Sequence, residues 1–400
     1  MADEDIAPPD VALEVQPLGL SFHPLQDVVA VALIDGTIEL HTYTPTSTTR
    51  ALKLSHHTDS CRAVEFSVAG DAMFSVSADK ALCAVDANGQ LVWREEGAHD
   101  HAINCLSLLG NGIGGVAAGG GACGSGGGGG SAGGGGAAAR QADIVATGDD
   151  EGVVKVWDIR TRRAVMEFHE HTDFISDFEV HPDGMHLLAT SGDCTLSVMD
   201  LRQQKLLARS EDQEDELMSC VLLKHAKKIL CGTTQGLMHI FSWGQFADMG
   251  DRFAGHPASV DTIIPIDEQT VATGSSDGLI RICQIQPNKL LGVVGDHDDN
   301  PVELLKWSRE RALIGSLSHD DVVHFWDVRF LQDDDDEDED DEDDAGGGGG
   351  SAAAAAAAAA LGMDGMDDDD DDEQPKPKGK GKGKKKTKAQ HMNEDFFEDL

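Results

Sequence analysis

The chain repeats a unit of about 42 residues seven times between Val11 and Phe330. When the copies are aligned on one turn position, the equivalent residues are Asp35, Asp79, Glu151, Asp193, Gln235, Asp277 and Asp320. The steps between them are 44, 72, 42, 42, 42 and 43 residues, and the one long step contains a glycine-rich insertion. A period of this length restricts the chain to folds in which each copy forms one unit and packs against its neighbours.

Each copy is predicted to form four short strands. In the third copy the strands cover residues 103–109, 144–147, 153–157 and 164–168, and small and acidic residues suited to a tight hairpin join the middle two. Six positions after the turn, Trp157 and Trp326 each begin a Trp-Asp pair. This pair at this period resembles the blades of WD-repeat propellers. We therefore predict an all-β protein, a seven-bladed WD-repeat β-propeller with a disordered, charged C-terminal tail.

Changes in composition divide the chain into segments. Residues 1–10 are predicted to be a disordered N-terminus, residues 11–331 the propeller, and residues 332–400 a disordered tail rich in acids, alanine and lysine. Residues 110–142 are nearly all glycine and alanine and are predicted to form a disordered loop in blade 3, without the lysine of a phosphate-binding loop. The seventh copy ends after its third strand, so we expect residues 11–15 to supply the missing outer strand.

The charge of the chain argues against duplex DNA binding by the propeller. The formal net charge is −41; 24 acids and 8 lysines from Asp333 onward account for −16, which leaves −25 on residues 1–332. Basic proteins are more plausible partners for so acidic a body. No apolar run is long enough for a membrane span, and the N-terminus lacks the pattern of a secretory signal. The eight scattered cysteines are interpreted as reduced core residues of an intracellular protein.

A histidine precedes several of the turn acids by about 22 residues. In WD-repeat proteins such a histidine, a serine or threonine of the second strand, the turn acid and the third-strand tryptophan form a hydrogen-bonded tetrad. The predicted tetrads are His297, Ser316, Asp320 and Trp326 in blade 7; His99, Thr147, Glu151 (or Asp150) and Trp157 in blade 3; and, without tryptophan, His57, Ser75 and Asp79 in blade 2 and His256, Thr273 and Asp277 in blade 6. This structural role is favoured over a catalytic pair, and no enzyme activity, cofactor or metal is predicted.

A second pattern, Trp-Asp-x-Arg, ends the third strand in two copies. Its acidic and basic members are Asp158 and Arg160 in blade 3, Asp327 and Arg329 in blade 7, and, in a degenerate copy without tryptophan, Asp200 and Arg202 in blade 4. The pattern resembles the box of cullin-4 ubiquitin ligase substrate receptors, in which the arginine faces the damaged-DNA-binding adaptor protein. The alternative is that each arginine only pairs with neighbouring acids.

The tail contains two further candidate features. Its lysines, Lys376, Lys378, Lys380, Lys382, Lys384, Lys385, Lys386 and Lys388, are typical of a nuclear or nucleolar address, with direct RNA contact and simple solubilisation as alternatives. Phe396 and Phe397 lie side by side in an otherwise polar C-terminus. Neither feature is needed for a propeller, so both are candidates for a function of the tail.

Individual segments also indicate a family. The stretches Leu18-Gly-Leu-Ser-Phe-His-Pro24, Cys61-Arg-Ala-Val64, Asp251-Arg-Phe253 and Asp395-Phe396-Phe397 are similar to those of the WD repeat-containing protein 55 family. So are Ala146-Thr-Gly-Asp-Asp150 and Thr273-Gly-Ser-Ser-Asp-Gly-Leu-Ile-Arg281. The resemblance spans all seven copies and the last residues but not the glycine-rich loop or the alanine run. It implies a nucleolar protein involved in ribosomal RNA production and ribosome biogenesis, and plant relatives of the family are linked to the cullin-4 adaptor.

Together these features predict a non-enzymatic scaffold of the nucleus and nucleolus, with the cytoplasm as an additional location, monomeric within a larger complex. The expected partners are pre-ribosomal factors or basic ribosomal proteins. A cullin-4 substrate receptor and a propeller that binds histones or chromatin are the alternative functions. Blades 1 and 5, which lack a tetrad, are expected to be the least stable.

Overall fold

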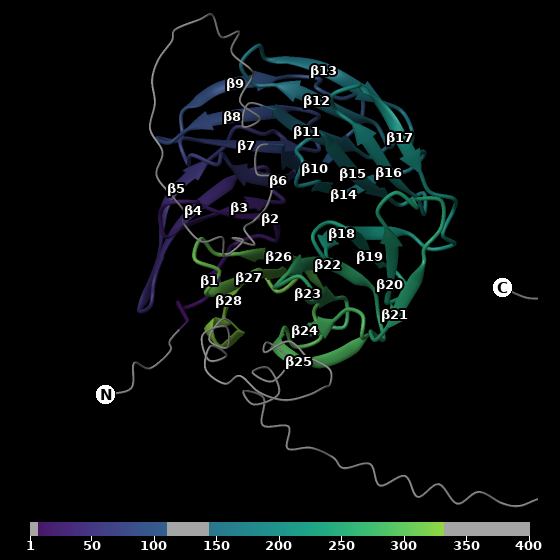
Figure 1. Ribbon diagram of the computed structural model, residues 1–400. Helices are drawn as coiled ribbons and strands as arrows, with labels where there is room; N and C mark the ends of the chain where they lie inside the picture. The colour runs from purple at the N-terminus through teal and green to yellow at the C-terminus, as the bar shows by residue number, and fades with distance from the viewer. Residues whose placement is uncertain (1–6, 110–143, 332–400) are drawn as a thin grey trace, which may run out of the picture. The chain divides into compact units, whose positions relative to one another are not determined.

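The computed structural model describes residues 7–109 and 144–331, which form seven four-stranded antiparallel sheets arranged in a ring (Figure 1). The predicted fold class, a seven-bladed β-propeller, is confirmed. The predictions for the N-terminal residues 1–6, the glycine-rich insertion and the tail fall outside the described residues. Within the described ranges no helix is long and apolar enough to cross a membrane.

The strands of each blade follow one another from the centre of the ring outward. The innermost strands of blades 1 to 7 are β2 (Pro17–Phe22), β6 (Cys61–Phe66), β10 (Ile103–Leu108), β14 (Ile175–Val180), β18 (Leu217–Leu223), β22 (Val260–Pro265) and β26 (Val302–Trp307). The second strands are β3 (Val28–Leu33), β7 (Ala72–Ser77), β11 (Ile144–Asp149), β15 (His186–Ser191), β19 (Lys228–Thr233), β23 (Thr270–Ser275) and β27 (Leu313–Ser318).

The third and outer strands complete the blades. The third strands are β4 (Ile38–Thr44), β8 (Leu82–Asp86), β12 (Val154–Asp158), β16 (Leu196–Asp200), β20 (Leu237–Ser242), β24 (Leu279–Gln284) and β28 (Val322–Asp327). The outer strands of blades 1 to 6 are β5 (Ser47–Leu54), β9 (Leu91–Glu95), β13 (Arg163–Phe168), β17 (Lys205–Arg209), β21 (Asp251–Ala254) and β25 (Lys289–Asp296). The outer strand of blade 7 is β1 (Val11–Ala12), and a short 3-10 helix, η2 (Arg329–Leu331), follows β28.

Burial along the strands explains their sequences. All but the first residue of β15 are buried, whereas exposed and half-buried positions alternate along β17 in the same blade. A middle strand is covered on both faces by neighbouring blades, and its sequence is therefore a nearly continuous run of apolar and small residues. An outer strand meets water on one face, so its side chains alternate.

The core is divided into seven apolar clusters, one between each pair of adjacent blades. The cluster between blades 7 and 1 joins Val29 and Val31 of β3 to Leu317 of β27 and Phe325 of β28. Both faces of every sheet are thus covered by its neighbours, and no blade has to bury its apolar faces alone.

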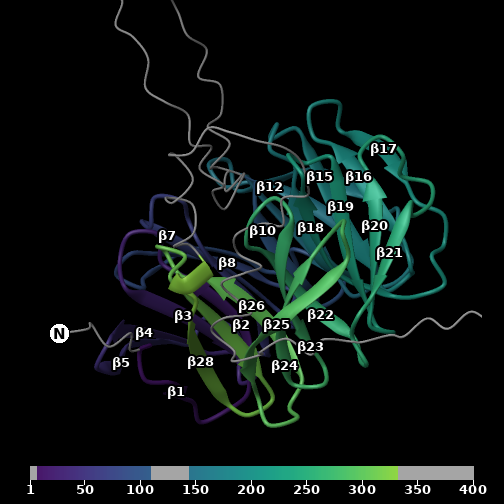
Figure 2. The same cartoon turned by 60° about the horizontal axis from the view of Figure 1, so that its bottom comes forward.

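The ring closes through the N-terminal strand β1. Val11 pairs with Val323 and Ala12 with Val322 in antiparallel register, which places β1 beside β28 (Figure 2). The expected closure is confirmed, although the pairing is limited to two residues of the predicted segment. In blade 3, β10 and β11 pair from Ile103 with Asp149 to Leu108 with Val145, with one register shift between Ile103 and Cys105. The four pairs nearest the glycine-rich insertion, from Cys105 with Gly148 to Leu108 with Val145, keep a regular register.

Candidate functional site

Blade 7 brings its four predicted tetrad members into one chain of hydrogen bonds. The Nδ1–H of His297 donates to Oδ2 of Asp320 over 2.9 Å, and its Nε2 lies 2.8 Å from the hydroxyl oxygen of Ser316. The indole N–H of Trp326 donates to the same hydroxyl over 2.7 Å. Because the imidazole is fully buried and both of its nitrogens are bonded, this chain fixes strands β27 and β28 to the loop before β26.

Blade 3 forms the same chain with a different acid. His99 lies 2.7 Å from the Thr147 hydroxyl, which also accepts the Trp157 indole N–H over 2.9 Å. Its Nδ1–H, however, donates over 2.8 Å to Asp149. The assignment of Glu151 is therefore wrong, and so is the alternative Asp150. The Glu151 side chain is exposed, and only its backbone N–H bonds to Asp149.

The reason for this error lies two positions before the turn. Asp149 ends strand β11 at the place where blades 2, 4, 6 and 7 have Ser77, Ser191, Ser275 and Ser318. An aspartate here reaches the imidazole from the end of the strand, and its other oxygen accepts the backbone N–H groups of Glu151 and Val153. A second acid two residues before the turn acid was the only sequence signal of this exchange.

Blades 2 and 4 keep the histidine and the acid. In blade 2, His57 lies 3.2 Å from Asp79 and 2.9 Å from the Ser75 hydroxyl, as predicted for this group. In blade 4, Nδ1 of His171 lies 3.1 Å from Asp193. Its Nε2 lies 2.7 Å from the hydroxyl of Ser197 in the third strand, and the Thr195 hydroxyl lies 3.1 Å from Nδ1. This serine, which lies four residues after the turn acid, was not among the predicted tetrad residues.

The same position changes the arrangement in blade 6. Arg281, four residues after Asp277, binds both carboxylate oxygens, at 2.9 and 2.6 Å. Asp277 is therefore not the partner of His256, which corrects the prediction for this blade. His256 keeps Thr273 at 2.8 Å, but its Nδ1 has no hydrogen-bond partner among the described residues.

Burial and the nearby Arg281 guanidinium lower the pKa of His256 to about 4. In blade 7 burial likewise lowers the pKa of His297, although the Asp320 carboxylate opposes the shift. Burial by itself would raise the pKa of Asp320, but the hydrogen bonds from His297 and the backbone N–H of Val322, together with the nearby histidines, outweigh burial and lower that pKa. These shifts favour a neutral imidazole at His256 and His297, a state suited to a structural hydrogen bond.

Blades 1 and 5 use other buried polar groups. In blade 1, the buried Glu39 binds His41 at 3.0 Å, Arg50 at 2.9 Å and Lys53 at 3.2 Å. In blade 5, the buried Asp215 accepts the Thr234 hydroxyl over 2.6 Å. Both blades thus contain a local polar cluster where the tetrad is missing, and whether they are the least stable blades stays a prediction.

We expect Asp320→Asn to lower the free energy of unfolding by about 1.5 kcal/mol, because the carboxylate oxygens accept bonds from His297, His324 and a backbone N–H. The exposed Gln235 donates only its backbone N–H to Asp215, so Gln235→Ala should stay within about 0.5 kcal/mol of the parent. Urea unfolding of the full chain measures both values. Equal midpoints for the two variants would contradict the structural role of the tetrad.

The two ends of the blades differ in charge. At one end lie the turns between second and third strands and the loops that lead to the next blade; among the residues of these segments the only lysine or arginine is Lys80. Their exposed acids are Glu14, Asp35, Asp59, Glu96, Asp100, Glu151, Asp173, Glu211, Asp212, Glu214, Glu216, Asp298, Asp299 and Asp321. We call this surface the acidic face. Acids predominate in these segments, although Lys53 and Arg94 of adjoining strands lie 3.9 Å from Asp35 and 3.5 Å from Glu96.

Comparison with known proteins identifies the family of this propeller. The WDR55 family model matches residues 138–331. The WD repeat-containing protein 55 homolog of Dictyostelium discoideum is 35% identical over 334 residues, covering 83% of this chain and 74% of the relative. The WD repeat-containing protein 55 of Arabidopsis thaliana is 36% identical over 322 residues, with 80% and 82% covered. The chain belongs to the WD repeat-containing protein 55 family.

The human WD repeat-containing protein 55 is 33% identical over 328 residues, which cover 81% of this chain and 78% of the relative. The WD repeat-containing protein JIP5 of Coprinopsis cinerea is 37% identical over 335 residues. These matches confirm the predicted resemblance. As a WD-repeat propeller, this family member belongs to a class of folds that generally serve protein–protein interaction.

In every blade the third strand begins at the acidic face and ends at the opposite end of the blade. The arginines of the Trp-Asp-x-Arg boxes follow this strand, so all of them lie at that opposite end. We call this end the arginine face. The Arg160 side chain is 65% exposed and lies 3.6 Å from Asp158. Arg202 is also exposed, while the buried Asp200 accepts the backbone N–H of Gln203 over 2.7 Å. Arg160 and Arg202 therefore project from adjacent blades.

Arg329 differs from the other two box arginines. Its guanidinium binds both carboxylate oxygens of Asp327, with its Nε 3.1 Å from each. Arg329 begins the short helix η2, whose Leu331 is buried against blade 7. In this blade the structure matches the alternative reading of the box, in which the arginine pairs with a neighbouring acid.

Proposed function

We propose that this family member is a non-catalytic scaffold that supports ribosomal RNA production and ribosome biogenesis in the nucleolus. In this proposal the acidic face binds basic ribosomal proteins or basic segments of pre-ribosomal factors. The observation that carries it is the charge of that face, whose described turns and loops contain fourteen exposed acids and one lysine. A field of one sign accelerates the encounter with a cationic partner and disfavours acidic competitors.

The charge contrast between the two ends supports this choice of face. The described turns of the arginine face contain basic and acidic residues in similar number, among them Arg160, Arg202, Asp27 and Asp248. Mixed charges produce little net field at a distance. Selective attraction of a basic protein is therefore expected only at the acidic face.

The test removes negative charges from the acidic face and compares the result with a matched control. The variant Asp298→Asn, Asp299→Asn, Asp321→Asn removes three exposed charges from the acidic face, and Asp27→Asn, Asp71→Asn, Asp248→Asn removes three from the other end. We expect the first variant to bind purified basic ribosomal proteins roughly tenfold more weakly, with a reduced salt dependence, and the second to bind as the parent does. Equal loss in both variants would contradict the choice of face.

The cellular part of the proposal rests on the lysine block and the terminal Phe396 and Phe397. Proximity labelling should compare the full chain with one that ends at Phe330. We expect the full chain to label pre-ribosomal factors in the nucleolus and the shortened chain to lose them. Unchanged nucleolar labelling after truncation would remove the tail from the proposal, and absence of pre-ribosomal factors from both samples would overturn the function.

Receptor function in a cullin-4 ligase is the second candidate, because Arg160 and Arg202 are exposed on adjacent blades of one face. Two guanidinium groups placed in this way offer forked donors to acids of an adaptor. The experiment is co-precipitation of the damaged-DNA-binding adaptor with Arg160→Ala, Arg202→Ala. Arg162→Ala is the matched control, since Arg162 is exposed in the same turn but outside the box. Undiminished binding by the double variant would exclude this function.

A further inference from the structure

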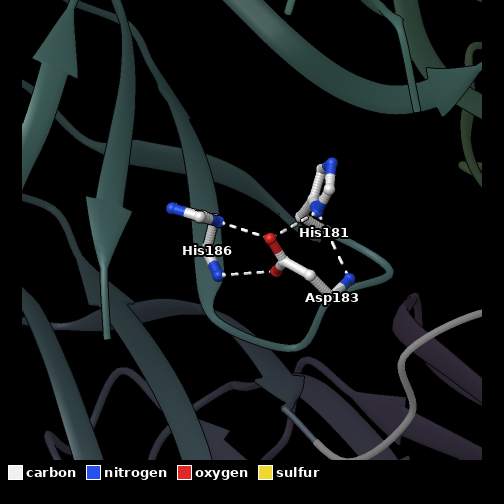
Figure 3. A group of neighbouring side chains, drawn as sticks. All are labelled: His181, Asp183 and His186. Atoms are coloured by element: carbon white, nitrogen blue, oxygen red, sulfur yellow. Dashed lines mark hydrogen bonds and ion pairs between the residues drawn. The ribbon is translucent and has the colours of Figure 1, made fainter. Parts of the chain in front are cut away.

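The turn between β14 and β15 in blade 4 brings two histidines onto one carboxylate oxygen (Figure 3). Oδ2 of Asp183 lies 3.0 Å from Nδ1 of His181 and 2.7 Å from Nδ1 of His186. All three atoms lie within 4.8 Å of one another. The group belongs to the arginine face, and neither the tetrads nor the proposed function uses it.

The turn holds the carboxylate in this orientation. Oδ1 of Asp183 accepts the backbone N–H of Met185 over 2.7 Å and that of His186 over 3.3 Å. Gly184 lies between them with φ of +65°, a conformation that glycine adopts without strain. Oδ1 is thereby occupied by the backbone, and Oδ2 is left for the two imidazoles.

A neighbouring blade holds the imidazoles in place. Trp243, just after β20 of blade 5, stacks on His181 with ring centroids 4.0 Å apart and meets His186 edge-on at 5.5 Å. The side chains of His181 and His186 are only 16% and 20% exposed. Figure 3 shows their Nδ1 atoms turned toward Asp183 and their Nε2 atoms turned away. The three ligand atoms are thus positioned before any ion arrives.

We propose that His181, Asp183 and His186 form a binding site for a divalent transition metal, with Zn²⁺ as the best-fitting ion. Two imidazole nitrogens and one carboxylate oxygen are a donor set that suits zinc, and water would complete a tetrahedron. Ligand atoms in such a tetrahedron are roughly 3.3 Å apart, as follows from metal–ligand distances of about 2.0 Å. The two oxygen–nitrogen spacings, 3.0 and 2.7 Å, would have to open by roughly 0.3 and 0.6 Å. The two nitrogens already lie within 4.8 Å of each other, and a surface turn permits shifts of this size.

An ion at this site would stabilise part of the arginine face. The backbone carbonyl of Met185, inside the turn, accepts the N–H of Leu201 over 2.8 Å. Leu201 precedes Arg202, and His186 pairs with Asp200 across the blade. Metal binding therefore fixes the turn against the segment that presents Arg202. This consequence does not depend on which partner the arginine face binds.

The experiment titrates the full chain with Zn²⁺ against a chromophoric chelator and, separately, with Cu²⁺ while tryptophan emission is recorded. Cu²⁺ quenches an indole that lies beside its ligands, so Trp243 reports on this site even if the acidic tail binds ions elsewhere. We expect one tight Zn²⁺ per chain, a raised melting temperature and saturable quenching by Cu²⁺. Trp243→Phe should remove the quenching and keep the bound Zn²⁺.

The decisive variants are His186→Gln and Asp183→Asn, with His169→Gln as the control because His169 is exposed and pairs only with Glu167. Loss of a ligand should weaken Zn²⁺ binding by at least about 100-fold, the upper end of what loss of a hydrogen-bond partner of a ligand costs. Circular dichroism establishes that each variant is folded. Unchanged Zn²⁺ binding in His186→Gln and Asp183→Asn, or quenching by Cu²⁺ that persists in Trp243→Phe, would overturn the proposal.

Discussion

Asp149→Asn should lower the free energy of unfolding by about 2–3 kcal/mol, the range expected when charge-assisted bonds are lost in the interior. Asp149 is 1% exposed. One oxygen accepts His99 over 2.8 Å, and the other accepts two backbone N–H groups at 3.1 and 2.8 Å. The asparagine amide must turn its NH₂ toward one of these donors, so at least one buried donor loses its acceptor.

Glu151→Gln is the matched control, because Glu151 occupies the turn position of the repeat but is exposed. Its carboxylate meets only His101, at 3.8 Å, and an exposed pair of this kind contributes little. We expect a change within about 0.5 kcal/mol for this variant. Urea unfolding followed by circular dichroism measures both, and a larger loss in Glu151→Gln than in Asp149→Asn would reverse the assignment of the acid in blade 3.

Acidification from pH 6.5 to pH 4 should remove about 3 kcal/mol of stability through His256 alone, at about 1.4 kcal/mol for each pH unit. Its ordinary pKa of 6.5 falls to about 4 in the fold, through burial and the nearby Arg281. Between these two values the unfolded chain binds a proton and the folded chain does not. Stability from this group is therefore complete above pH 6.5, is lost as the pH falls, and changes no further below about pH 4.

The measurement is the free energy of unfolding as a function of pH for the parent chain and for His256→Gln. Glutamine can still bond to Thr273, and we expect it to flatten the profile between pH 6.5 and 4. The paired carboxylates, such as Asp79 and Asp320, have lowered pKa values, so the stability that they contribute is lost at pH values below that window. An equally steep profile for His256→Gln would contradict the role of the buried imidazole.

Much of the fold could be predicted because it depends on a pattern that recurs. The turn position is followed by a residue with positive φ in every copy, glycine in four blades and Lys80, Cys194 and Asp321 in the others. At Gly152 an added Cβ would lie 2.7 Å from the backbone carbon of His171, so the next blade restricts this position as well. Signals repeated seven times outweigh local irregularities such as the glycine-rich insertion.

The polar interior was predicted less completely, because single side chains compete for one partner. In blade 6 Arg281, instead of His256, binds the carboxylate of Asp277. In blade 4 the hydroxyl of Ser197, in the third strand, replaces a second-strand hydroxyl. Both residues lie four positions after the turn acid. The spacing of the chain limits which groups come near one another, but the bond formed depends on distances of a few tenths of an ångström and on which donor is charged.

The sequence by itself determined the seven blades, the order of their strands and the closure by the N-terminal strand, because the hydrophobic period and its spacing specify them. Only the tertiary structure decided that Asp149 is the acid of blade 3, that His256 has a free ring nitrogen among the described residues, and that Trp243 stacks on His181. Contacts between Trp243 and His181 join two blades. They depend on how the sheets twist and pack, which the repeat does not encode in any one copy.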